Sequence, residues 1–130
     1  MQDYKTGTER ILIVDDDEGI AKLEAMMLER LGYNVTPTVN CLDALASFEA
    51  DPGEFDLVIT DMTMPGMSGD TFAKELIAIR PDIPVIICTG FSERVNEETA
   101  KSIGVKGFLM KPVNWSGLAE MVRNVLDEAK

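Results

Sequence analysis

Four charged side chains follow three short apolar runs of the sequence and could form one chemical site. Asp15 and Asp16 follow one run, Asp61 follows a second and Lys111 follows a third. The runs are residues 11–14, 57–60 and 108–110. If they are neighbouring parallel strands, their carboxyl ends open on a single crevice. Three carboxylates and a lysine in that crevice would hold a divalent cation beside a phosphoryl group.

The composition limits the class of protein. The chain has 130 residues, 45% of them hydrophobic, which suits one globular core. A formal net charge of -11 argues against binding to nucleic acid or to an anionic membrane face. No apolar run approaches the ~20 residues of a membrane span and no signal peptide opens the chain, so we expect a cytoplasmic location.

Histidine is absent from the chain, which excludes Ser-His-Asp and Cys-His catalysis and the common zinc sites. The chain therefore cannot itself present a phosphohistidine. Cys41 and Cys88 stand far apart beside apolar residues. We expect both to be buried, reduced thiols rather than a disulfide or a metal site.

Short apolar runs alternate with segments of helical periodicity along the whole chain. The predicted strands are residues 10–14, 34–39, 55–60, 84–88 and 107–110, and the predicted helices have apolar positions over 20–31, 42–48, 72–79, 95–103 and 118–126. Ser68 and Ser92 stand where a helix N-cap is wanted, and Gly32 and Gly104 stand where helices should end. Strict alternation predicts a single α/β domain with a parallel sheet covered on both faces.

Pro37 indicates the position of the second strand in the sheet. Proline cannot donate to a neighbouring strand, so this strand suits an edge of the sheet. With right-handed crossovers the strand order becomes 2-1-3-4-5, a doubly wound, flavodoxin-like (βα)5 fold. The switch point then falls between the first and third strands, which end at Asp15 and Asp61.

Each candidate residue also has an ordinary structural interpretation. Aspartates after a strand often cap the next helix, and we expect Asp17 to do so. Asp61 alone is compatible with a turn, and Lys111 alone with a solvated lysine. Thr89 alone suits a strand-end hydroxyl bound to local backbone.

Four segments in order resemble the receiver domain of two-component response regulators: residues 11–17, 58–69, 86–90 and 108–112. The likeness runs from about Arg10 to Ala129. Residues 7–10 and 87–92 also resemble the receivers at the C-terminal end of hybrid sensor histidine kinases. We therefore expect a flexible tail or linker over residues 1–8 and a receiver domain over 9–130.

The resemblance implies a role for each site residue. Asp61 matches the phosphoacceptor, whose carboxylate becomes an acyl phosphate. Asp15 and Asp16, with Asp61 and the backbone carbonyl of Thr63, match the ligands of Mg²⁺ or Mn²⁺. Lys111 matches the lysine that contacts the phosphoryl oxygens, and Thr89 matches the hydroxyl that hydrogen-bonds one of them.

The resemblance also implies a switch in which Thr89 moves toward the phosphoryl group and the aromatic ring of Phe108 turns inward. Thr63, Gly90 and Phe91 match positions that tune access of donor and water to the phosphoryl group. A cis peptide bond is expected between Lys111 and Pro112.

The expected partner is a sensor histidine kinase or a histidine phosphotransfer domain. The expected output surface is the face of the fourth helix, fifth strand and fifth helix, which is also the expected surface of a homodimer. Beyond autophosphorylation and slow autodephosphorylation, we expect no enzyme activity from this domain, although a parent chain that is a hybrid histidine kinase would have one.

Two other functions remain open at this stage. One is a metal-dependent phosphatase or phosphotransferase that works through an aspartyl phosphate. Such enzymes carry a second acid two residues beyond the nucleophile, where this chain has Thr63. The other is a pseudo-receiver that binds partners without being phosphorylated, which the intact set of key residues disfavours.

Overall fold

The computed structural model describes residues 6–90 and 104–129. They form a parallel sheet of five strands in the order β2-β1-β3-β4-β5, as the sequence predicts. The strands are β1 (Arg10–Val14), β2 (Asn34–Thr38), β3 (Leu57–Asp61), β4 (Val85–Thr89) and β5 (Gly107–Met110). β3 and β4 each end one residue later than predicted, so Asp61 and Thr89 are the last residues of their strands.

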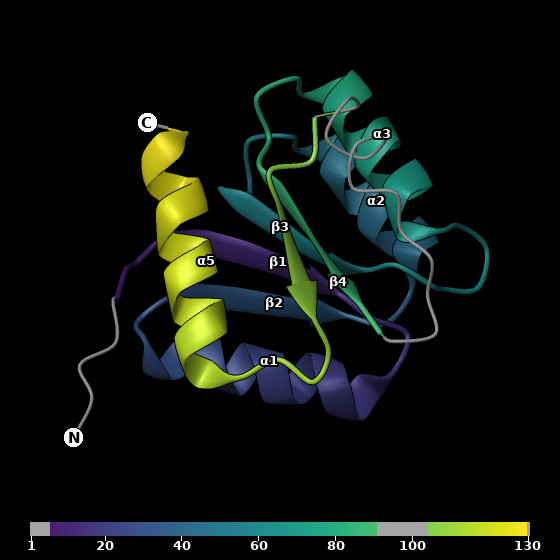
Figure 1. Ribbon diagram of the computed structural model, residues 1–130. Helices are drawn as coiled ribbons and strands as arrows, with labels where there is room; N and C mark the ends of the chain where they lie inside the picture. The colour runs from purple at the N-terminus through teal and green to yellow at the C-terminus, as the bar shows by residue number, and fades with distance from the viewer. Residues whose placement is uncertain (1–5, 91–103, 130) are drawn as a thin grey trace.

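Helices cover both faces of the sheet. The helices are α1 (Glu18–Arg30), α2 (Cys41–Ala50), α3 (Gly69–Ile79) and α5 (Trp115–Glu128). Figure 1 shows α1 and α5 on one face and α2 and α3 on the other. The predicted fourth helix and its expected cap, Ser92, lie outside the described residues.

The central strands supply side chains to both layers. Ile11 and Ile13 of β1 pack in the cluster with α1 and α5, whereas Leu12 and Val14 pack in the cluster with α2 and α3. Successive strand residues point to opposite faces, so a strand with helices on both sides needs a continuous apolar run. β1 and β3 pair in parallel with Val14 opposite Thr60, so the carboxyl ends of the two strands lie next to each other.

Short polar side chains start the helices. Asp17 caps α1 and accepts a hydrogen bond from the backbone nitrogen of Ile20 at 3.2 Å, as predicted. Asn40 and Asn114 cap α2 and α5 in the same way. Ser68 is the N-cap residue of α3 but makes no side-chain cap bond. These caps satisfy backbone donors that have no partner inside a helix.

The segment before β1 is bonded to the domain through Arg123 of α5. The Arg123 guanidinium donates to both carboxylate oxygens of Glu9, at 3.1 and 2.6 Å, and to the carbonyl of Thr6 at 3.3 Å. The backbone nitrogen of Gly7 donates to the carbonyl of Leu31 at 3.1 Å. Residues 6–8 of the expected tail therefore contact the folded domain.

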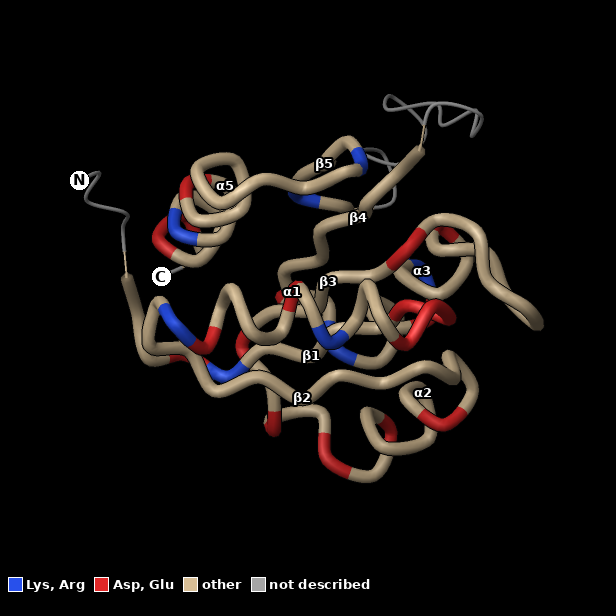
Figure 2. The backbone as a smooth tube through the Cα atoms, turned by 90° about the horizontal axis from the view of Figure 1, so that it is seen from below, with Lys and Arg blue, Asp and Glu red and all other residues tan. Residues whose placement is uncertain are grey.

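Acidic side chains are spread over all four described helices, and α2 carries no basic residue (Figure 2). Cys41 and Cys88 are both free and buried, as predicted. Burial raises the pKa of the Cys88 thiol well above its ordinary value. Cys88 is therefore an unreactive part of the core.

Candidate phosphoryl-transfer and metal site

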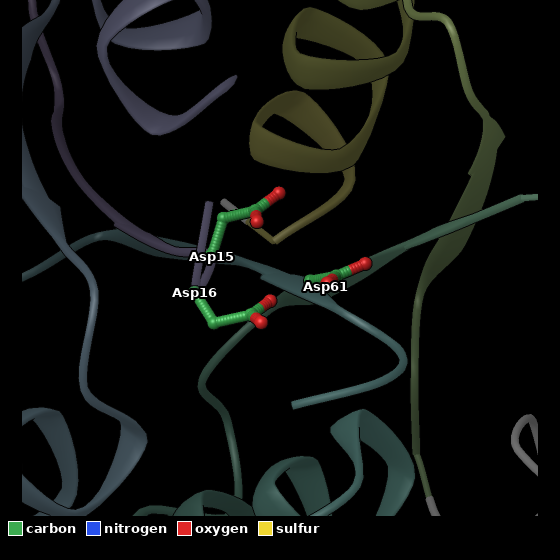
Figure 3. A group of neighbouring side chains, drawn as sticks. All are labelled: Asp15, Asp16 and Asp61. Carbon is green, nitrogen blue, oxygen red and sulfur yellow. The ribbon is translucent and has the colours of Figure 1, made fainter. Parts of the chain in front are cut away.

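Three carboxylates gather at the carboxyl ends of β1 and β3 (Figure 3). Asp15 and Asp16 directly follow β1, and Asp61 ends β3. One oxygen from each carboxylate lies within 4.8 Å of the others. Asp15 and Asp61 are only 2% and 5% exposed, whereas Asp16 is open to solvent. Strand order alone produces this cluster, because β1 and β3 are hydrogen-bonded neighbours.

Lys111 points into this cluster from the segment after β5. Its ammonium nitrogen lies 2.7 Å from Asp61 Oδ1 and 3.0 Å from Asp15 Oδ2. Burial alone would lower the pKa of Lys111, but the hydrogen bonds to Asp61 and Asp15 outweigh it and raise the pKa above its ordinary value. The ammonium group is therefore a permanent positive charge between two carboxylates. The bond from Lys111 to Pro112 is cis, the form that the resemblance implies.

Backbone groups hold the two buried carboxylates in place. The nitrogen of Asp17 donates to Asp15 Oδ1 at 2.9 Å, and the nitrogen of Met62 donates to Asp61 Oδ1 at 3.0 Å. Gly69, the first residue of α3, donates its nitrogen to the carbonyl of Met62 at 2.6 Å. The start of α3 thus lies against the backbone of the Asp61 segment.

Thr89 ends β4 and is 7% exposed. Its hydroxyl lies 3.9 Å from the sulfur of Met110, the limit of a weak hydrogen bond. Phe108 is half-buried and packs against the cluster of α2 and α3. Gly90 is half-buried beside Thr89 and Thr63 is exposed after β3, while Phe91 lies outside the described residues.

Glu24 is a charged residue near the site that the sequence analysis missed. It lies on α1, is 4% exposed, and lines a cavity together with Lys111. Burial, followed by repulsion from Asp15, raises the pKa of Glu24 from about 4.5 to about 7. A signal was present, because Glu24 shares the helical spacing of the buried Leu28 and Met27.

The chain belongs to the family of response regulator receiver domains, whose model matches residues 11–123. The response regulator receiver domain protein of Clostridium thermocellum has a solved structure that superposes with a TM-score of 0.87 and 32% identity. That match covers 92% of this chain and 95% of the other. Fold and strand order therefore agree with the receiver domains of two-component signalling proteins.

Curated relatives are longer than this chain. The Sensor kinase CckA of Brucella abortus is 31% identical over 95% of this chain, which corresponds to 13% of that protein. The Transcriptional regulatory protein ZraR of Salmonella typhimurium is 35% identical over 89% of this chain and 26% of its own length. The matched domain thus occurs both in a kinase and in a transcriptional regulator. Among the described helices, none has the length and apolar character needed to cross a bilayer.

Proposed function

We propose that Asp61 of this receiver domain accepts a phosphoryl group from a phosphohistidine. The observation that carries this proposal is the nearly buried Asp61 carboxylate, whose Oδ1 accepts from the backbone nitrogen of Met62 and from the Lys111 ammonium. A carboxylate fixed in this way is oriented for attack, and the adjacent ammonium offsets the charge that develops on the transferred group.

The residues present fit a hard divalent cation. Asp15, Asp16 and Asp61 bring three oxygen ligands within 4.8 Å of one another, and the Lys111 ammonium is already attracted to two of them. The backbone carbonyl of Thr63 is the fourth proposed ligand. When bound, Mg²⁺ or Mn²⁺ would neutralise the carboxylates and the incoming phosphoryl oxygens.

The proposed transfer is a substitution at phosphorus. An oxygen of Asp61 attacks phosphorus, the bond from phosphorus to the donor imidazole nitrogen breaks, and the imidazole leaves with its electron pair and takes a proton from solvent. Lys111 then holds a phosphoryl oxygen, and the Thr89 hydroxyl donates to another. Movement of Thr89 leaves space for Phe108 to turn, which transmits the change to β5.

The proposed phosphodonor is a sensor histidine kinase or a histidine phosphotransfer domain, since this chain has no histidine of its own. The occurrence of the domain within a protein named as a sensor kinase supports a hybrid kinase as one parent chain. The proposed output and homodimer surface is the face of β5, α5 and the fourth helix, without nucleic acid or membrane contact, and the proposed location is the cytoplasm.

Incubation with Mg²⁺ and a small phosphodonor tests the function. We expect one adduct of about 80 Da, the mass of a phosphoryl group, and its loss in Asp61→Asn. Asp43→Asn, an exposed acid on α2, is the matched control and should be labelled normally. Multiple turnover of the donor would favour a phosphatase or phosphotransferase, and no adduct would favour a pseudo-receiver.

A further inference from the structure

Glu24 is a buried carboxylate that the proposed transfer does not use. It lies on the side of α1 that faces the core, among the buried residues of that helix. Within residues 6–90 and 104–129 its side chain forms neither a hydrogen bond nor an ion pair. Because burial of an unpaired charged group is unfavourable, an acid in this position requires an explanation.

Glu24 faces a cavity of about 270 Å³ between α1 and the segment that follows β5. The other lining residues are Ile20, Leu23, Met27, Lys111, Pro112 and Val113. Among them Lys111 is the single basic residue, and the remaining walls are apolar. The cavity therefore places one acid and one base on a common surface from which most polar groups are absent.

Lys111 is bonded to two of the carboxylates that the proposed metal site uses. Its ammonium group is bonded to Asp15 Oδ2 and Asp61 Oδ1, two of the three clustered carboxylates. A divalent ion on Asp15 and Asp61 would lie close to the Lys111 ammonium, and repulsion between the two cations would weaken the bonds of Lys111 to these carboxylates. The displaced ammonium then needs another acceptor, since burying it unpaired is costly.

We propose that Glu24 is a positioning residue that accepts the Lys111 ammonium group when Asp15 and Asp61 turn to a divalent cation. Glu24 would keep Lys111 inside the site, from where it returns to the phosphoryl oxygens after transfer. The role rests on the proposed function, because it needs the metal to bind at the three aspartates. It also explains why α1 carries a buried acid whose charge serves no contact in the metal-free state.

The test is a titration of the metal-free protein with MgCl₂, followed by calorimetry. In Glu24→Gln, which keeps the shape and removes the charge, we expect Mg²⁺ to bind about tenfold more weakly, the size of one charge-assisted hydrogen bond. Glu29→Gln removes an exposed charge from the same helix and should leave the affinity within about twofold.

A second background separates this role from a purely electrostatic or structural one. In Lys111→Met there is no ammonium group to displace, so adding Glu24→Gln should change the Mg²⁺ affinity by less than about twofold. An equal tenfold loss in both backgrounds would mean that Glu24 acts on the metal by its field alone and would overturn the proposal. An unchanged affinity of Glu24→Gln in the wild-type background would overturn it as well.

The location of Lys111 gives an independent readout. A structure with Mg²⁺ bound should place the Lys111 nitrogen within about 3.2 Å of a Glu24 oxygen. An ammonium group that stays on Asp61 or turns into solvent would contradict the role of Glu24 while leaving phosphorylation of Asp61 intact. A wild-type chain that binds no Mg²⁺ and gives no adduct would overturn both proposals.

Discussion

Gly69 lies directly against the main chain of Asp61, at the point where α3 begins. A Cβ atom on Gly69 would collide with the carbonyl oxygen of Asp61 and would approach the Cα atom of Met62 to 2.9 Å. Backbone rather than a flexible side chain occupies that space. Gly69, to which the family resemblance gives no chemical role, thus packs against the backbone of the proposed phosphoacceptor Asp61.

We expect Gly69→Ala to destabilise the domain by about 1 to 3 kcal/mol, the range for overpacking a filled site, although alanine is the better helix former. Chemical denaturation measures this change. Because the shift falls on the backbone of Asp61, labelling by a small phosphodonor should slow as well. Gly53→Ala is the control, since a Cβ there meets its nearest atom at an ordinary 3.7 Å; equal losses in both variants would refute the contact.

Metal binding should stabilise the fold. At a Mg²⁺ concentration one hundred times the Kd, the free energy of unfolding should rise by about 3 kcal/mol, and a chelator should reverse the gain. Asp16→Asn removes one proposed ligand from an exposed side chain, so we expect a normal fold with a much smaller response to Mg²⁺. Thermal unfolding with and without Mg²⁺ gives the answer, and an undiminished response in Asp16→Asn would exclude that residue as a ligand.

Glu24 should make the metal-free protein less stable as the pH rises. Burial and the nearby Asp15 raise its pKa from about 4.5 to about 7, while Lys111 opposes and Asp61 adds to the shift. Between pH about 4.5 and about 7, Glu24 is protonated in the folded state but ionised in the unfolded state. The free energy of unfolding therefore falls as the pH rises through this range and loses the whole contribution of Glu24 above about pH 7.

Glu24→Gln removes this titration. Relative to wild type, the variant should gain stability at pH 8, by at most about 3 kcal/mol, and the difference should shrink toward pH 4. Denaturation curves across this range in the absence of metal measure the effect, with Glu29→Gln as the control for losing one acidic charge. A constant difference at all pH values would argue against a raised pKa at Glu24.

Arg123 should matter more to stability than the exposed ion pairs. Its side chain is 12% exposed, and its guanidinium donates to both oxygens of Glu9, whose side chain is 15% exposed. Arg123→Ala removes two charge-assisted hydrogen bonds from that poorly solvated carboxylate, so we expect a loss of about 2 kcal/mol. Lys22→Ala, which breaks the exposed pair with Glu18, should have no measurable effect. Equal denaturation midpoints for the two variants would contradict this ranking.

The parts of the structure that sequence could predict are those set by local pattern. Continuous aliphatic runs and one proline were enough for the strand order, which placed Asp15 and Asp61 together. β4 separates β3 from β5, so Lys111 reaches these carboxylates only through its long side chain. Glu24 was missed because a glutamate on an amphipathic helix is usually solvated, and its burial depends on the packing of α1 against the segment after β5. The Arg123 contacts with Glu9 were missed for the same reason: they join opposite ends of the chain, which no local pattern records.

The β2 edge of the sheet resists the addition of a further strand. The backbone nitrogen of Asn34 and the carbonyl of Thr38 form hydrogen bonds on the β1 side of β2. Because the backbone groups of successive strand residues point to alternate sides, the nitrogen of Pro37 faces away from β1. A neighbouring molecule that tried to extend the sheet there would meet a ring in place of an N–H donor. Pro37 therefore disfavours the association of copies of this domain into continuous sheets and fibres. We expect association through the helical faces instead.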